Sequence, residues 1–210
     1  MREDIPYKTT DLTKNRVLVL AAHADDEILG CGGSLIKHIK AKDPVKIIIF
    51  TDDISKVNQE RRKKEAIRAL RLIKIKDISW LGFKDGRLND HLAIDSLRRG
   101  IDSFSPTLIY LPSQEEIHPD HLTLAEATKQ VYKQLKNKST LAYYEISAPL
   151  KPNALVDITK EIDLKLKALR CYTSQLAQND YLEKIKGLNR YRTYTLPKNI
   201  KYAEAFRIVS

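Results

Sequence analysis

The sequence has few cysteines and no long apolar run, and each shortage excludes a class of protein. Its two cysteines, Cys31 and Cys171, lie far apart among 210 residues, so the chain has no disulfide framework. No apolar stretch approaches the roughly 20 residues that a membrane-spanning helix requires. The first six residues include no apolar segment of the kind found in signal peptides. We therefore expect a cytoplasmic protein without a membrane span.

Aromatic residues are also scarce, and this bears on the meaning of the net charge of +10. The positive excess favours anionic partners but identifies none of them. Nucleic-acid binding would require basic residues clustered with aromatics on one face. The tyrosines between Tyr181 and Tyr194 show no such order. We therefore predict a small-molecule partner, with no nucleic acid, and expect most lysines to be solvated. The oligomeric state stays open.

A chain of 210 residues with 42% apolar residues is expected to form one domain, residues 1–210, with a sizeable core. The first two-thirds alternate short apolar strands with polar-faced helices. This alternation predicts a mostly parallel sheet with helices on both faces. The strands are expected at 16–22, 45–51, 77–81 and 107–111, and the helices at 28–41, 58–72, 94–104 and 121–137. In the last third we expect strands at 141–146, 154–158 and 202–208, and helices at 161–175 and 180–188.

Two apolar strands end in His and Asp residues. The first runs into His23 and then into the consecutive carboxylates Asp25-Asp26-Glu27. The strand at 107–111 is followed by His118-Pro119-Asp120-His121. Charges at the end of a buried strand are costly unless something pairs with them, and a divalent cation would do so. Sites in parallel sheets form beyond the carboxyl ends of the strands. The two segments therefore look like halves of one metal site.

His23, Asp26 and His121 would supply two imidazoles and one carboxylate. A catalytic zinc commonly takes three protein ligands and leaves one position for water. This set favours Zn²⁺, and it leaves Fe²⁺ open as the resting metal.

Three further residues of these segments have candidate catalytic roles. Asp25 is free to act as a base on water. His118 can present a proton or positive charge to a developing oxyanion. Asp120 can hold His118 in one tautomer or raise its pKa.

Each segment also has a plain structural interpretation. Asp25-Asp26-Glu27 can complement a helix dipole, and His118-Pro119-Asp120-His121 can be a capping turn with proline at the first helical position. Their joint occurrence at equivalent points of two strand–helix units favours the metal site. Gly30-Cys31-Gly32-Gly33 does not fit a dinucleotide loop, because the acidic triplet separates it from the strand. We expect close packing of a helix on the sheet there.

These motifs resemble those of the LmbE-like, or PIG-L, metal-dependent N-deacetylases. Ala22-His23-Ala24-Asp25-Asp26-Glu27 is similar to the family's A-H-P/A-D-D-E motif, and His118-Pro119-Asp120-His121 to its H-P-D-H motif. Weaker similarities extend over much of the chain: Arg62-Lys63-Lys64-Glu65, Leu81–Leu88, Tyr172-Thr173-Ser174-Gln175 and Ala203-Glu204-Ala205-Phe206. One departure is Thr51-Asp52-Asp53, where many members have a glycine in the turn.

The resemblance implies a Rossmann-like α/β sandwich. It gives His23, Asp26 and His121 as metal ligands, Asp25 as general base, and His118, with Asp120 as its partner, as the oxyanion-stabilising histidine. It also matches Arg62 and Asp85 to substrate-contacting positions. The implied activity is removal of an N-acetyl group from an N-acetylglucosamine-type sugar or conjugate. Because of Arg62 and the net charge, we expect the conjugate to be anionic.

A non-catalytic sugar- or nucleotide-binding α/β protein with a degenerate site is the alternative. Every position of the proposed catalytic set is filled, which favours the enzyme. Whether Asp25 or His118 protonates the leaving amine is left open by the sequence.

Overall fold

The computed structural model describes residues 6–135 and 139–210. Its strands form one sheet in the order β3-β2-β1-β4-β5-β7-β6. Neighbours from β3 to β5 are parallel, whereas β7 is antiparallel to β5 and β6, so the predicted mostly parallel sheet is confirmed. The strands are β1 (Val17–Ala21), β2 (Val45–Asp52), β3 (Asp77–Lys84), β4 (Leu108–Pro112), β5 (Thr140–Tyr144), β6 (Ala154–Asp157) and β7 (Ala203–Val209).

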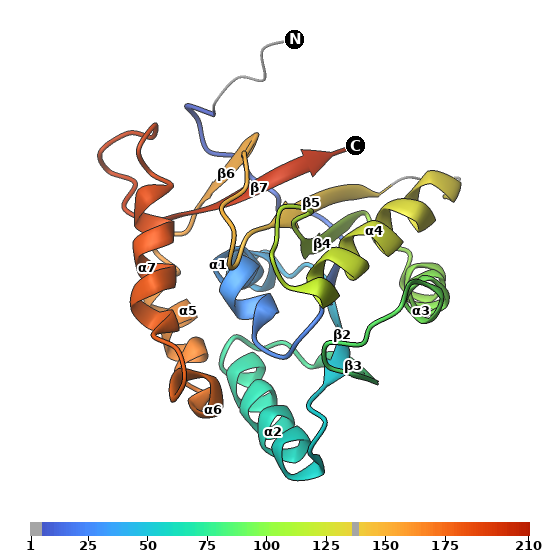
Figure 1. The fold of residues 1–210 in the computed structure, drawn as a ribbon. Coiled ribbons are helices and arrows are strands. Elements are labelled where there is room, and N and C mark those ends of the chain that lie inside the picture. The colour runs from blue at the N-terminus through green and yellow to red at the C-terminus, as the bar shows by residue number, and fades with distance from the viewer. Residues whose placement is uncertain (1–5, 136–138) are drawn as a thin grey trace.

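Helices cover both faces of the sheet (Figure 1). The helices are α1 (Asp26–Lys40), α2 (Lys56–Leu72), α3 (Asp90–Phe104), α4 (Pro119–Gln134), α5 (Ile162–Leu169), α6 (Thr173–Leu176) and α7 (Tyr181–Tyr191). Side chains alternate along β1: Val17 and Val19 join the core beneath α1, α2 and α5, and Leu18 and Leu20 join the core beneath α3 and α4. Burial on both faces explains why this strand is apolar throughout.

Several helices differ from the expected ones, and α3 begins at Asp90, four residues before the expected start at residue 94. The predicted helix at 161–175 is two helices, because the chain turns at Tyr172 and buries its ring. α1 and α4 begin two residues early, at Asp26 and Pro119, which puts Asp26 and His121 in their first turns. α4 ends at Gln134, and residues 136 and 137 of the prediction lie outside the described residues.

The strand order places the two sequence motifs side by side. After β1 the chain builds β2 and β3 on one side, and it then returns to β4 on the other side of β1. The segments after β1 and β4 therefore adjoin at the point where the winding of the sheet reverses, which is where parallel sheets form ligand crevices.

The departure at Thr51-Asp52-Asp53 has a simple structural basis. The side chain of Asp53 accepts a hydrogen bond from the Ser55 N–H at 2.8 Å. An Asx-type turn of this kind closes without glycine.

Candidate metal-dependent active site

The turn between β1 and α1 carries the first half of the site. The Asp26 carboxylate accepts a hydrogen bond from the backbone N–H of His23 at 2.8 Å, which holds the Asp26 side chain against the His23 backbone. Asp25 between them has φ 130, outside the conformations that non-glycine residues ordinarily adopt. Its N–H donates to Glu27 Oε2 at 3.1 Å, and its carbonyl accepts from Ile28 and Leu29. Such conformations persist only where the surroundings enforce them, and they gather at functional sites.

The three predicted metal ligands converge on one point. His23 Nδ1 lies 3.2 Å from His121 Nε2, and Asp26 Oδ2 lies 3.2 Å from His121 Nε2 and 3.7 Å from His23 Nδ1. Tetrahedral zinc with bonds of about 2.0–2.1 Å places its ligand atoms roughly 3.3–3.4 Å apart. Two imidazole nitrogens and a carboxylate oxygen at this spacing suit a divalent cation.

Two other groups of side chains also gather ligand atoms within 4.8 Å: His23, His118 and His121, and His23 with Asp85, His118 and Asp120. They share His23 with the first set. The His118 ring lies as near, with its centroid 4.5 Å from His23 and 5.3 Å from His121, but its Nδ1 already accepts from the Asp120 N–H. We take the triangle of His23, Asp26 and His121 as the better metal site.

Each ligand histidine has a carboxylate on its second nitrogen. His23 Nε2 lies 3.0 Å from Asp85 and 3.2 Å from Asp120, and His121 Nδ1 lies 3.4 Å from Glu116. Such partners orient a metal-binding imidazole and raise its basicity.

Glu116 was not anticipated by the sequence analysis. Its carboxylate is buried and also accepts from the N–H groups of Ile146 and Ser147. The only sequence signal was an acidic residue two positions before His118. Its partner loop comes from a distant part of the chain, so no local pattern marks its role.

Electrostatics in the triangle favour cations. Burial disfavours the charged Asp26 carboxylate, but the His121 charge and hydrogen bonds from His121 and His23 outweigh burial and hold the pKa of Asp26 below its ordinary value. Burial also opposes the charged His121 ring, but the charge of Asp26 raises the pKa of His121 to about 9. Burial, and next the charge of Asp26, raise the pKa of Asp25 to about 8.

His118 is the N-cap of α4. Its Nδ1 accepts from the backbone N–H of Asp120 at 3.2 Å, which leaves Nε2 as the protonated nitrogen of the neutral ring. Burial, and then the charges of His23 and His121, lower the pKa of His118. Its side chain is 38% exposed, compared with 11% for His23, so His118 is the more accessible of the two histidines.

The Asp120 carboxylate does not hydrogen-bond the His118 ring, although its charge acts to raise the pKa of His118. It accepts from the N–H groups of Gly86 and Leu88 at 2.7 and 3.1 Å and contacts His23. The tautomer of His118 is thus set by the Asp120 backbone, and the carboxylate holds the 86–88 loop against the site.

Arg62 and Asp85 also lie at the site. Arg62 Nη1 is 4.0 Å from Asp85 Oδ2, and Nη2 donates to the Ala24 carbonyl at 3.4 Å. The Arg62 Nε atom is buried without a hydrogen-bond partner. Glu65 lies three residues further along the same helix and could pair with Arg62, but it binds Arg61 and the segment at 173–174.

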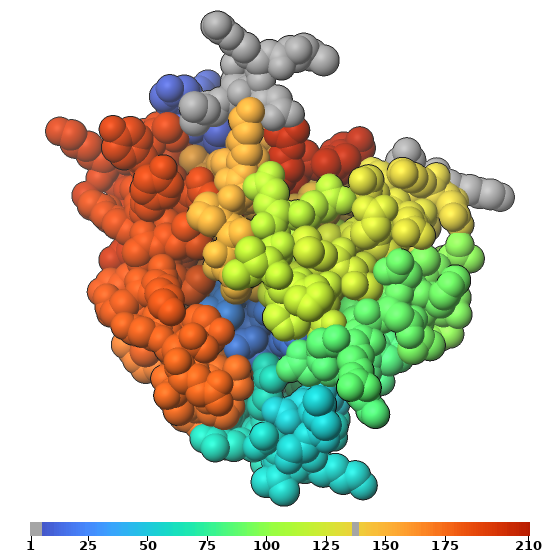
Figure 2. Space-filling view, in the orientation of Figure 1, coloured from blue at the N-terminus to red at the C-terminus, as the bar shows by residue number. Residues whose placement is uncertain are grey.

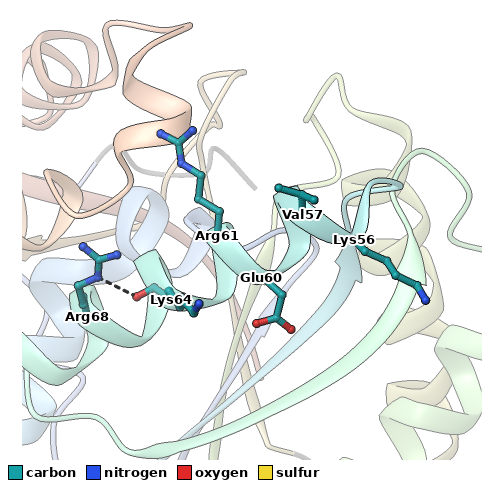
Figure 3. Close-up of a pocket in the computed structure, with 6 residues that line it drawn as sticks. All are labelled: Lys56, Val57, Glu60, Arg61, Lys64 and Arg68. Atoms are coloured by element: carbon teal, nitrogen blue, oxygen red, sulfur yellow. Dashed lines mark hydrogen bonds between the residues drawn. The ribbon is translucent and has the colours of Figure 1, made fainter.

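The exposed part of the site is His118, whose side chain is 38% exposed. Figure 2 shows part of the blue N-terminal segment at the bottom of a hollow between orange, yellow-green and teal segments. A different hollow of about 580 Å³ lies along the outer face of α2 (Figure 3). Its lining comes from α2 alone and includes no ligand of the triangle: Lys56, Val57, Glu60, Arg61, Lys64 and Arg68. It is a groove between long solvated side chains, separate from the chemistry.

The fold and the site define an α/β protein with a candidate metal site of two histidines and one carboxylate at the reversal point of its sheet. The family model of PIG-L, described as GlcNAc-PI de-N-acetylase, matches residues 18–132, more than half of the chain. The chain belongs to this family, as the sequence motifs predicted.

Known proteins resemble the chain over most of its length. It is 29% identical over 188 residues to a probable N-acetyl-α-D-glucosaminyl L-malate deacetylase 2 of Bacillus subtilis (strain 168), with 77% of this chain and 84% of that protein covered. The solved structure of a conserved protein, TT1542, from Thermus thermophilus has a TM-score of 0.83 and 28% identity, over 92% of this chain and 94% of the other.

More distant structures share the fold. The N,N'-diacetylchitobiose deacetylase of Pyrococcus horikoshii has a TM-score of 0.79 at 24% identity and covers 93% of this chain and 84% of its own. A 4-carboxy-2-hydroxymuconate hydratase of Pseudomonas putida has a TM-score of 0.75 at 18% identity, with 92% and 95% covered. Because one fold carries both chemistries, the activity has to be argued from the site.

Within the described part of the chain, no helix has the length and apolar character to cross a membrane.

Proposed function

We propose that the protein is a metal-dependent hydrolase that removes the N-acetyl group from an N-acetylglucosamine-type sugar or sugar conjugate. The observation that carries this proposal is the triangle of His23, Asp26 and His121, with Asp25 beside it, in a chain of the PIG-L family. A small-molecule substrate, a cytoplasmic location and a single domain spanning residues 1–210 belong to the same proposal.

His23, Asp26 and His121 would hold the ion, and their two nitrogens and one oxygen suit Zn²⁺ or Fe²⁺. When bound, the ion supplies Lewis-acid activation of water and of the acetyl carbonyl. Asp85, Asp120 and Glu116 keep the two histidine rings in the orientation in which His23 Nδ1 and His121 Nε2 meet in the triangle, where they would hold the ion.

Asp25 takes the proton of the attacking water. It is buried beside Asp26, and its strained backbone fixes the carboxylate in place. His118 stabilises the oxyanion that develops on the acetyl oxygen, because the Asp120 N–H holds its ring with Nε2 as the donor. With His118 committed as a donor to oxygen, Asp25 returns its proton to the leaving amine.

Metal analysis combined with a free-amine assay on N-acetylglucosamine conjugates tests this function. We expect about one divalent ion per chain and release of the free amine. His121→Ala should lose most of the metal, and full retention would remove His121 from the ligand set. Bound metal together with sugar binding but without amine release would favour the non-catalytic sugar-binding alternative.

We further propose that the sugar conjugate is anionic. The buried Arg62 Nε without a partner, and a guanidinium 4.0 Å from Asp85, leave donor capacity for a phosphate or carboxylate.

The substrate charge is tested by the ratio of kcat/KM for anionic over neutral conjugates. This ratio should exceed one in the wild type and fall in Arg62→Ala. Arg61→Ala is a matched control, because the neighbouring Arg61 side chain is 56% exposed and pairs with Glu65. Equal ratios in the wild type and Arg62→Ala would show that Arg62 does not select the substrate.

A further inference from the structure

A buried ion pair lies against the helix that carries the proposed ligand Asp26. Lys165 of α5 and Glu204 of β7 are fully buried, and their charged atoms are 2.7 Å apart. Both residues lie outside residues 18–132, which the family model matches, and Glu204 belongs to the Ala203-Glu204-Ala205-Phe206 segment.

The pair contacts α1 at a break in the helix. Cys31 has φ −139 and ψ 16, which is not helical, so α1 consists of a first turn and a longer second segment. The second segment opens with the N–H groups of Gly33 and Ser34, which donate to the two Glu204 oxygens at 2.7 Å each. The first segment ends near the Leu29 carbonyl, which accepts from Lys165 Nζ at 2.9 Å.

The charges match the backbone groups that they meet. In an unbroken α-helix the Gly33 N–H would pair with the Leu29 carbonyl four residues earlier. Here Glu204 and Lys165 connect these two groups through the ion pair. An anion at the start of one helical segment and a cation at the end of another also complement their dipoles.

The glycines of α1 allow this approach. A Cβ on Gly32 would lie 3.3 Å from Lys165 Cγ, so the stem of the lysine passes close to the helix backbone. Asn189 of α7 and the Ser34 hydroxyl complete the hydrogen bonding, at 3.0 Å from Lys165 Nζ and 2.6 Å from Glu204 Oε2. The Lys165–Glu204 ion pair is therefore buried with hydrogen-bond partners for both charged groups. A buried, fully hydrogen-bonded pair holds its neighbours in one geometry, unlike an ion pair exposed to solvent.

We propose that Lys165 and Glu204 are positioning residues for the metal site. By joining the two segments of α1 they set the direction of its first turn, and hence the position of Asp26 against His23 and His121. This role rests on the proposed function only in taking Asp26 as a metal ligand.

The test compares Lys165→Met, Glu204→Gln and the double variant by Co²⁺ titration of the metal-free protein and by urea unfolding. The double variant should be more stable than either single one, because no buried charge is left unpaired. Its Co²⁺ affinity should still be about 10–100-fold weaker than wild type, the range seen when groups behind metal ligands are removed. Wild-type affinity in the double variant would overturn the proposal.

His38→Gln is the matched control. His38 is buried on the same helix beyond the break and bonds Asp43 and Tyr110. This variant should lose stability and keep its Co²⁺ affinity. An equal loss of affinity in the control would show that affinity follows general stability, and it would also overturn the proposal.

Hydrogen exchange in the metal-free protein tests whether Lys165 and Glu204 hold the first turn of α1 in place, independently of metal binding. The double variant should exchange faster at residues 28–30 and unchanged at residues 36–40. Unchanged exchange at 28–30 contradicts the positioning role. Failure of the wild type to bind Co²⁺ would instead count against the proposed function.

Discussion

Asp25 joins a strained backbone to a buried carboxylate, and both features belong to a single residue. Its φ of 130 costs free energy that the Glu27 carboxylate and the start of α1 must offset. Under the proposed function this cost has a reason, because the carboxylate has to lie beside the proposed metal ligands without becoming one of them.

Asp25→Asn should keep the metal and lose activity by a factor on the order of 10²–10⁴, because an amide cannot accept the proton of water. The measurement is turnover together with metal content per chain. Near wild-type turnover with the metal bound would refute the assignment of Asp25 as the base.

His118→Ala should lower kcat far more than it raises KM, because the oxyanion contact exists mainly in the transition state. A loss of roughly 10²–10³-fold is the scale of one deleted oxyanion donor. Steady-state kinetics check this. A change confined to KM would mean that His118 only binds substrate.

At the scale of the element, α1 shows how glycines bring a helix close to a sheet. A Cβ on Gly30 would come 2.3 Å from the Tyr144 ring, and one on Gly33 would come 2.6 Å from Ile158. The structure therefore confirms the close packing expected of the Gly30-Cys31-Gly32-Gly33 segment. The packing is possible because the glycines have no side chains.

Gly30→Ala should destabilise the fold by about 1–3 kcal/mol, because α1 must move away from the Tyr144 ring. Gly187→Ala is the comparison: it lies in α7, and its Cβ would meet nothing within 4 Å. That change should stabilise by about 0.5–1 kcal/mol through helix propensity. Urea unfolding measures both. Equal effects at the two positions would show that the Tyr144 contact is not what limits Gly30.

Glu65 shows a link between elements distant in the chain. Its carboxylate on α2 accepts from the Thr173 hydroxyl at 2.6 Å and from the Ser174 N–H at 3.0 Å. Two motifs that looked independent in the sequence thus meet at one contact, which holds α6 against α2.

At the scale of the molecule, a buried polar network joins helix α1 to the central strand β4. On the face of the sheet that α1 covers, His38 Nδ1 lies 2.7 Å from Asp43, and its Nε2 lies 3.0 Å from the Tyr110 hydroxyl. Burial lowers the pKa of His38 despite the hydrogen bond to Asp43.

The lowered pKa of His38 makes stability depend on pH. The unfolded chain, with a pKa near 6.5, binds a proton that the folded state resists, so the stabilising contribution is present above that pH. It is lost as the pH falls from there toward the folded-state value. The free energy of unfolding should therefore fall more for wild type than for His38→Gln between about pH 7.5 and about pH 5.5. Parallel curves for the two proteins in urea would contradict this.

The sequence by itself determined the alternation of strands and helices, the mostly parallel sheet, and the residue types of the triangle of His23, Asp26 and His121, which we propose to hold a metal. Local periodicity carries the first two, because side-chain spacing along the chain decides which residues are buried. The triangle could be predicted from the sequence because its two short motifs follow the ends of two strands, and a parallel sheet brings these ends to one edge.

Only the tertiary structure decided the residues that support the site. Glu116 accepts a hydrogen bond from the loop that follows β5. Lys165 and Glu204 contact α1 from α5 and β7. Tyr172 buries its ring and thereby divides a predicted helix in two. The physical reason is that each of these side chains is placed by partners remote in sequence. The role of a buried polar group depends on its hydrogen-bond and ion-pair partners, and the spacing of residues along the chain does not predict partners that are remote in sequence.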